Sequence, residues 1–127
     1  MRISHIAIYV ADLEAMKDFY VRYFGAIPNE KYSNDQTGLQ TYFLAFNGEV
    51  RIEIMSRPDL LERNKYSDRI GFSHLAFRMG SREDVDQQTA RLMADGFTVS
   101  SRPRVTGDGY YESVVLDPEG NRIEITA

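Results

Sequence analysis

Two short sequences recur in this chain, one identical and one with a single Ile-to-Leu difference, and their repetition limits the fold more than any other feature. Ser4-His5-Ile6-Ala7 is matched by Ser73-His74-Leu75-Ala76, and Arg51-Ile52-Glu53-Ile54 is matched by Arg122-Ile123-Glu124-Ile125. The copies are offset by 69 and 71 positions, and the two His are the only ones present. A module of roughly sixty residues therefore occurs twice, with its His and Glu in corresponding places.

The composition predicts one folded domain over residues 1–127. Hydrophobic residues make up 43% and aromatic residues 12% of the chain, which is enough for a buried core and argues against disorder. The net charge of -4 argues against nucleic acid as a partner, because phosphate binding needs an excess of Lys and Arg. No apolar stretch approaches the roughly 20 residues that span a bilayer, so no membrane partner is expected.

The absence of Cys from the sequence restricts the chemistry. Disulfides, thiolate ligands and a cysteine nucleophile are excluded, so a bound metal has to be held by nitrogen and oxygen donors. A chain without Cys suits a reducing compartment. The N-terminus also lacks the pattern of a signal peptide, and we expect a cytoplasmic protein.

The hydrophobic pattern predicts the same elements in both halves. Residues 3–10 alternate as in a strand, with His5 on the face opposite the apolar row of Ile6, Ile8 and Val10. Asp12 is expected to cap a helix that Gly25 ends. In the second half Ser81 and Gly96 take these two roles, and the apolar stripe of the second helix is expected to consist of Val85, Leu92 and Met93.

Three strand-like stretches follow each helix, at about 30–36, 40–46 and 49–56, and at about 98–105, 110–117 and 121–126. The expected fold is α+β, with tandem βαβββ modules that form a curved, half-open mixed sheet around a cleft and helices outside. Module 1 covers about 1–57, a charged connector covers 58–69 with a short helical turn at 60–64, and module 2 covers about 70–127.

A metal site is the strongest functional prediction. If the two sheets curve around one cleft, the faces opposite the helices look inward and His5, Glu53, His74 and Glu124 converge. A single His in a strand is usually a partly buried structural residue, and a Glu between two Ile usually faces solvent. Because both Glu recur in register with both His, we favour a site for one divalent ion, Zn, Ni, Co, Fe or Mn, with coordination positions left open for substrate.

Further residues are weaker candidates for binding a small-molecule substrate. Tyr9 and Tyr111 could line a pocket, although aromatic residues at strand spacing more often belong to a core. Arg57, Arg102 and Arg104 could hold an anionic group by charge-assisted hydrogen bonds, although each could equally be a solvated surface residue.

The sequence resembles the vicinal oxygen chelate superfamily of glyoxalase I, bleomycin resistance proteins and dioxygenases along its whole length. The motifs that carry the resemblance are Ser4-His5-Ile6-Ala7-Ile8-Tyr9-Val10-Ala11-Asp12, Asp18-Phe19-Tyr20 before Phe24-Gly25, Ser73-His74-Leu75-Ala76-Phe77, and Leu116-Asp117-Pro118-Glu119-Gly120-Asn121-Arg122-Ile123-Glu124. The order His, Glu, His, Glu looks most like bacterial glyoxalase I. That resemblance implies a metal-dependent lyase, with Zn or Ni as the favoured ion, in which all four side chains are ligands.

The same resemblance implies a reaction and an assembly. Such enzymes isomerise the hemithioacetal of a 2-oxoaldehyde to a 2-hydroxyacyl thioester, with Glu124 as the implied base and Glu53 as its partner. Glyoxalase I typically has Arg and Asn where this chain has Tyr9 and Arg57, so glutathione is uncertain as the thiol. Fosfomycin-type epoxide opening, ring-cleaving dioxygenation and drug binding without catalysis are the alternatives, and members of this length commonly form homodimers.

Overall fold

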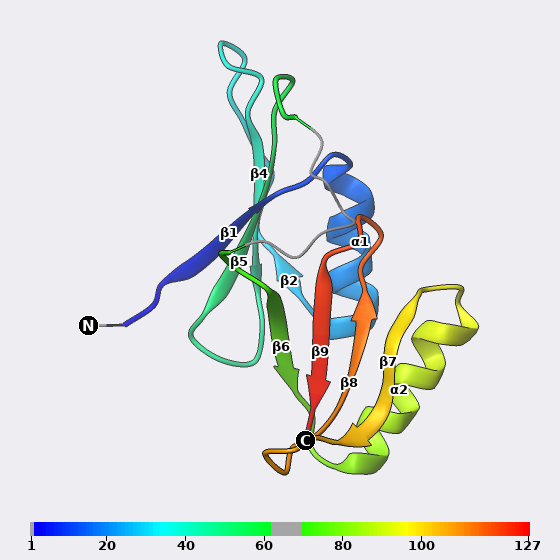
Figure 1. Cartoon of the computed structure of the whole chain (residues 1–127). Coiled ribbons are helices and arrows are strands. Elements are labelled where there is room, and N and C mark those ends of the chain that lie inside the picture. Colours follow the sequence, from blue (N-terminus) through cyan, green and yellow to red (C-terminus); the bar gives the residue numbers. More distant parts are fainter. Residues whose placement is uncertain (1, 62–69) are drawn as a thin grey trace. The chain divides into compact units, whose positions relative to one another are not determined.

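The computed structural model describes residues 2–61 and 70–127 (Figure 1). The chain divides into two compact units, Met1–Arg63 and Asn64–Ala127. Among the described residues, each unit has one mixed sheet and one helix packed on it, which confirms the predicted α+β class. Most of the helical turn predicted at 60–64 lies outside the described residues. No helix in the described part of the chain is long and apolar enough to cross a membrane.

The first unit contains β1 (His5–Tyr9), α1 (Leu13–Phe24), β2 (Ile27–Pro28), β3 (Tyr32–Ser33), β4 (Gln40–Ala45) and β5 (Arg51–Ser56). Its strands are ordered β1-β5-β4-β2, and β3 pairs with β4. β1 runs parallel to β5, while the other pairs are antiparallel. The parallel pair places the beginning of the unit beside its end, and this brings the first repeated sequence next to the second.

The second unit repeats this arrangement with β6 (His74–Arg78), α2 (Arg82–Ala94), β7 (Val99–Val105), β8 (Tyr111–Leu116) and β9 (Arg122–Thr126). The strand order is β6-β9-β8-β7, with β6 parallel to β9. The sequence repeat therefore corresponds to a repeat of topology, as predicted.

The single strand predicted over 30–36 is wrong. The structure has two strands of two residues each, β2 and β3, in this part of the first unit. Pro28 ends β2 and has no backbone N–H to continue a ladder. After β3, the Asn34 side chain accepts hydrogen bonds from the backbone N–H groups of Gln36 and Thr37. This local turn competes with strand pairing.

Helix α1 begins and ends where the sequence predicts. The Asp12 carboxylate accepts the backbone N–H of Ala15 at 2.9 Å, and Gly25 adopts the left-handed conformation with φ of 65°. The buried face, which packs on β4 and β5, consists of Leu13, Met16, Phe19, Tyr20 and Tyr23.

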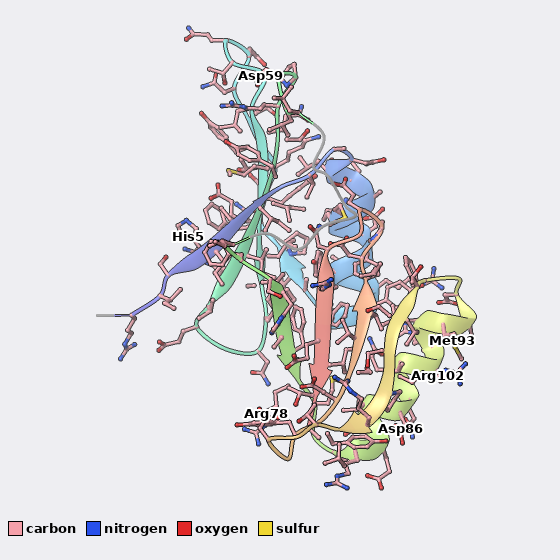
Figure 2. All side chains as sticks on the ribbon, viewed as in Figure 1. His5, Asp59, Arg78, Asp86, Met93 and Arg102 are labelled. Atoms are coloured by element: carbon pink, nitrogen blue, oxygen red, sulfur yellow. The ribbon has the colours of Figure 1, made fainter. Side chains whose placement is uncertain are left out.

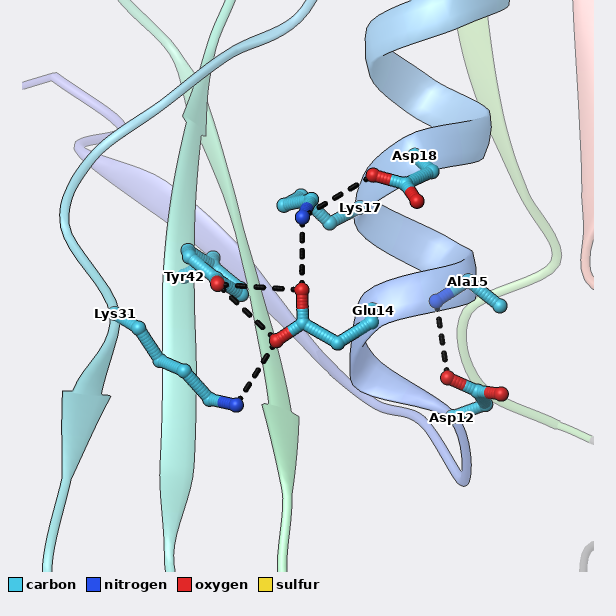
Figure 3. A network of polar contacts seen from close by, with 7 residues as sticks. All are labelled: Asp12, Glu14, Ala15, Lys17, Asp18, Lys31 and Tyr42. Carbon is cyan, nitrogen blue, oxygen red and sulfur yellow. Dashed lines mark hydrogen bonds and ion pairs between the residues drawn. The ribbon is translucent and has the colours of Figure 1, made fainter.

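A polar network fixes the first turn of α1 to β4 (Figure 3). The Glu14 carboxylate accepts hydrogen bonds from Lys17 at 2.7 Å, from Lys31 at 2.9 Å and from the Tyr42 hydroxyl at 3.1 Å. The hydrogen bonds from Lys17 and Lys31 lower the pKa of Glu14 to about 2. The network ties the helix to its sheet on the side away from His5, because Tyr42 alternates with Phe43 along β4.

Helix α2 begins at the predicted cap, since the Ser81 hydroxyl accepts the backbone N–H of Asp84 at 3.1 Å. Its last residue is Ala94, and Gly96 follows with φ of 90°. The predicted stripe is wrong at Met93, which is 49% exposed. Thr89 is buried instead, and its hydroxyl lies 2.6 Å from the Ser113 hydroxyl of β8. The contact between α2 and β8 thus contains the hydrogen-bonded pair of Thr89 and Ser113, whereas the sequence pattern predicted an apolar contact through Met93.

Candidate metal centre

The parallel strand pairs put one His and one Glu on the same face of each sheet. In the first unit His5 is opposite Arg51, and Ala7 is opposite Glu53. Successive side chains of a strand point to opposite faces, so the Ile on either side of Glu53 point toward α1 and are buried. His5 and Glu53 therefore share the face that α1 does not cover, and Figure 2 shows His5 on β1.

In the second unit, β6 pairs with β9 in the same register as β1 with β5. His74 is opposite Arg122, and Ala76 is opposite Glu124. The residue opposite each Glu is Ala in both units, and its small side chain leaves the carboxylate room to lean toward the imidazole. The repeat thus preserves the pairing as well as the residues.

The distances between the paired donors are nearly equal in the two units. His5 Nε2 lies 3.6 Å from Glu53 Oε2, and His74 Nε2 lies 3.4 Å from Glu124 Oε2. The imidazoles are 39% and 42% exposed, whereas the carboxylates are 17% and 20% exposed. Each unit therefore presents an accessible ring nitrogen beside a partly buried carboxylate oxygen.

These pairs fit a divalent metal ion of the kind that the fold family implies. Two donors bound at about 2.1 Å to one ion are about 3.0 Å apart in neighbouring octahedral positions and about 3.4 Å apart in tetrahedral ones. The observed separations are close to these values, and imidazole with carboxylate suits Zn, Ni, Co, Fe and Mn. Within neither unit does the described chain gather three or more His, Asp or Glu side chains into a metal-binding set. Each unit supplies two of the four predicted ligands.

Each imidazole has a hydrogen-bonding partner at its other ring nitrogen, Nδ1. The Ser4 hydroxyl lies 3.2 Å from His5 Nδ1, and the Ser73 hydroxyl lies 3.3 Å from His74 Nδ1. The Phe43 ring meets the His5 ring edge-on, with centroids 5.3 Å apart. Sequence reasoning gave the serines no role, although both belong to the repeated tetrapeptide.

Glu112 is a further residue near the candidate centre that sequence reasoning missed. It lies opposite Thr126, next to the pair formed by Val114 and Glu124, and so shares a face with Glu124. Burial raises the pKa of Glu112, and the neighbouring charge of Glu124 raises it further. Arg104 Nη2 lies 3.5 Å from Glu112 Oε1 and opposes this effect. Only the β8–β9 register reveals that the two carboxyl groups are neighbours.

Two of the predicted substrate-binding residues meet in the first unit. The Arg57 guanidinium lies 5.5 Å from the centre of the Tyr9 ring, and its Nε lies 2.8 Å from Asp59 Oδ1. Tyr9 and Arg57 line a pocket of about 410 Å³ together with Thr37, Leu39, Met55, Pro58 and Asp59.

The remaining three predicted substrate-binding residues are divided between the two faces of the second sheet. Along β7, Ser101 pairs with Val114 and Arg104 pairs with Glu112, so three steps on β7 match two on β8. This bulge between Ser101 and Arg104 reverses the alternation. Arg104 consequently faces the same way as Glu124, whereas Arg102 lines a pocket of about 130 Å³ against α2 with Asp86 and Met93 (Figure 2).

Tyr111 also lies on the α2 side of its sheet. Its hydroxyl donates a hydrogen bond to Asp86 Oδ1 at 2.7 Å, and the Arg82 guanidinium lies 5.0 Å from its ring. The hydrogen bond to Asp86 raises the pKa of Tyr111. Tyr111 and Arg102 are thus engaged with the helix, on the face opposite to His74 and Glu124.

The fold and the repeated His–Glu pairs define a class of protein, and comparison with known proteins shows the same class. The chain belongs to the Glyoxalase/Bleomycin resistance protein/Dioxygenase superfamily, whose family model matches residues 2–125. It is 31% identical over 126 residues to the uncharacterized protein YqjT of Bacillus subtilis (strain 168), covering 97% of this chain and 96% of YqjT.

Solved structures share this fold. The glyoxalase family protein from Enterococcus faecalis is 25% identical, with a TM-score of 0.82, covering 99% of this chain and 97% of that one. The trypanothione-dependent glyoxalase I of Leishmania major is 22% identical, with a TM-score of 0.77, covering 99% and 86%. The second likeness concerns the fold alone.

Proposed function

We propose that the protein is a metal-dependent lyase of the glyoxalase I type, which isomerises the hemithioacetal of a 2-oxoaldehyde and a thiol to a 2-hydroxyacyl thioester. The observation that carries this proposal is the duplicated His–Glu pair, with Nε2 to Oε2 separations of 3.6 and 3.4 Å. In this proposal His5, Glu53, His74 and Glu124 bind one divalent ion, Zn or Ni being favoured.

The two carboxylates carry the proton transfer in this proposal. The bound ion would supply stabilisation of the negative charge that develops on the substrate oxygens. Glu124 takes the proton from the carbon that bears the hydroxyl and the sulfur, and it returns the proton to the neighbouring carbonyl carbon. Glu53 assists as the corresponding carboxylate of the first module. The hydroxyl proton of the first carbon passes to the oxygen of the neighbouring carbon, so the first carbon becomes the thioester carbonyl and the second the new hydroxyl-bearing carbon. No proton is gained or lost overall, so no other reactant is needed.

The substrate proposal rests on the pocket of about 410 Å³ in the first unit. Tyr9 and Arg57 line it, and an anionic group of the thiol moiety could displace Asp59 from Arg57, which is 43% exposed. Arg104, on the face of Glu124, is a second candidate for such a group. Arg102 and Tyr111 are engaged with α2, and their role in substrate binding remains a prediction from the sequence. We leave the thiol open, since a glyoxalase I of the same fold is described as trypanothione-dependent.

The experiment that tests this function combines metal analysis with an activity assay. Protein purified without chelator and without a histidine tag is analysed for bound metal, reloaded with Zn²⁺ or Ni²⁺, and supplied with methylglyoxal hemithioacetals of several small thiols. Thioester formation that depends on the metal supports the proposal.

The alternatives predict other outcomes of the same experiment. Metal binding with activity only on an epoxide or a catechol would assign the protein to another metalloenzyme of the superfamily. A protein that binds bleomycin and no metal would be a sequestering protein. Homodimerisation and a cytoplasmic location remain predictions from the sequence.

A further inference from the structure

We infer that Ser4 and Ser73 are positioning residues, which hold the two imidazole rings through Nδ1 so that each Nε2 faces its glutamate. The functional consequence of this positioning, that Nε2 is the nitrogen offered to the metal ion, rests on the proposed function.

The geometry is the same in two independent places. Ser4 Oγ lies 3.2 Å from His5 Nδ1 and Ser73 Oγ lies 3.3 Å from His74 Nδ1, while the opposite ring nitrogens are 3.6 and 3.4 Å from Glu53 and Glu124. Both serines immediately precede the first residue of their strands, β1 and β6. The strict alternation of side chains does not yet apply there, so neighbouring side chains can reach each other.

The hydroxyl group suits this role because it can work with either form of the ring. A neutral imidazole has one N–H and one bare nitrogen, and a serine hydroxyl can donate to Nδ1 or accept from Nδ1–H. When Nε2 binds a metal ion, Nδ1 carries the proton and needs an acceptor, which in metal sites fixes both the orientation and the basicity of the ring. Alanine offers no acceptor at this position.

The first unit contains further contacts that hold the same ring. Arg51, opposite His5 in the register, donates from Nη2 to Ser4 Oγ at 3.5 Å, which occupies one lone pair and leaves the other lone pair and the proton for Nδ1. The Arg51 guanidinium also lies 4.6 Å from the Phe43 ring, whose edge meets His5. Ser4, Arg51 and Phe43 thus limit the rotation of the His5 ring.

Metal affinity provides the first test. Zn²⁺ is titrated against a chromophoric chelator into the tag-free full chain and into the variants Ser4→Ala, Ser73→Ala and the double variant. We expect each single variant to bind Zn²⁺ about 10-fold more weakly. This is the low end of the loss that is typical when an outer-shell partner is removed, because water can reach these half-exposed rings and replace the hydroxyl. The double variant should lose about 100-fold if the two serines act independently. Thr at either position keeps the hydroxyl and should restore most of the affinity.

Ser100→Ala is the matched control, because Ser100 is also an exposed serine, and its hydroxyl bonds elsewhere, to the backbone oxygen of Val114. It should leave Zn²⁺ affinity unchanged. Equal affinity of the wild type and the Ser4 and Ser73 variants would overturn the inference.

The ring nitrogens themselves provide a readout that does not depend on metal. The chain has two His, so long-range ¹H–¹⁵N spectra of the metal-free protein contain one imidazole pattern for each. Ser4→Ala should change the ¹⁵N shifts of His5 and leave those of His74, and Ser73→Ala should do the reverse. Unchanged shifts in both variants would contradict the inference. If the shifts respond but the wild type binds no Zn²⁺, the positioning role stands and the proposed function fails.

Discussion

At the scale of single residues, His74 is expected to be a direct metal ligand. His74→Ala should lower Zn²⁺ affinity by more than the roughly 10- to 100-fold typical of outer-shell partners, because imidazole contributes a directional bond that water replaces poorly. Chelator competition measures the effect. Arg78→Ala changes a side chain on the same face of β6 and should leave the affinity almost unaltered. Full metal occupancy in His74→Ala would remove this residue from the site.

Glu124 is expected to act on the substrate proton as well as on the metal. Glu124→Gln keeps the size of the side chain and one oxygen donor but loses the basic carboxylate, so turnover of metal-saturated protein should fall about 10²- to 10⁴-fold. The measurement is the initial rate at Zn²⁺ concentrations that saturate each variant. A rate that recovers fully with added metal would show that Glu124 only binds the ion.

Glu14 gives a prediction about pH and stability. Its pKa falls from 4.5 to about 2 on folding, so its contribution is present above pH 4.5 and is lost as the pH falls toward 2. Glu14 is 48% exposed, and solvent screening limits the contribution to about 1 kcal/mol. Urea unfolding should show Glu14→Gln to be less stable than the wild type at pH 7 and nearly equal to it near pH 2. Glu49→Gln, which removes an exposed pair with Arg2, should have little effect at either pH.

At the scale of elements, the contact between α2 and β8 depends on a buried pair of hydroxyl groups. Thr89→Val removes a partner of the Ser113 hydroxyl, whose residue is 0% exposed, and should cost about 1 to 3 kcal/mol. Ser113→Ala should cost only about 1 kcal/mol, since the Thr89 hydroxyl still donates to the Val85 backbone oxygen at 2.6 Å. The double variant should lose less than the sum of the two, which a double-mutant cycle of urea unfolding measures. Additive losses would mean that the two hydroxyls do not interact.

The elements also show which structural features can be predicted from sequence. Caps at Asp12 and Ser81 and the ends near Gly25 and Gly96 are local signals, and the structure contains all four. The bulge between Ser101 and Arg104 is different, because it depends on how β7 pairs with β8. It separates Arg102 from Arg104, which strict alternation would place on one face.

For the candidate site too, some features can be predicted from the sequence and others depend on strand pairing. The repeat alone predicted that the two His and the two Glu belong together, because all four recur at matching positions. The pairing of His5 with Glu53 and of His74 with Glu124 comes from the parallel registers of β1 with β5 and of β6 with β9. The neighbours of these pairs depend on registers that the sequence does not specify. Glu112 became a neighbour of Glu124 only through the pairing of β8 with β9, and Phe43 a neighbour of His5 only through that of β4 with β5.

At the scale of the whole molecule, the duplication explains why the four proposed ligands form two equal pairs. A single βαβββ unit offers one imidazole and one carboxylate, which is too few to hold a catalytic ion firmly. Two copies double the donors without requiring any new local structure. Variants of either pair should therefore reduce metal binding to a similar extent, in contrast to a site that one unit could form alone.

The predicted homodimer is also a property of the whole molecule. β1 lies at one edge of its sheet and is preceded by Ile3, which is 65% exposed. An open strand edge beside an exposed apolar side chain is a favourable surface for a second copy of the chain. Light scattering at micromolar concentration should give twice the chain mass of 14.6 kDa.

Ile3→Lys should shift the protein toward the monomer, because charge on an edge opposes pairing. Ile27→Lys is the matched control, at 70% exposure on the opposite edge strand, β2. If Ile27→Lys dissociates the dimer and Ile3→Lys does not, the contact uses the other edge, and a monomeric wild type would refute the dimer itself.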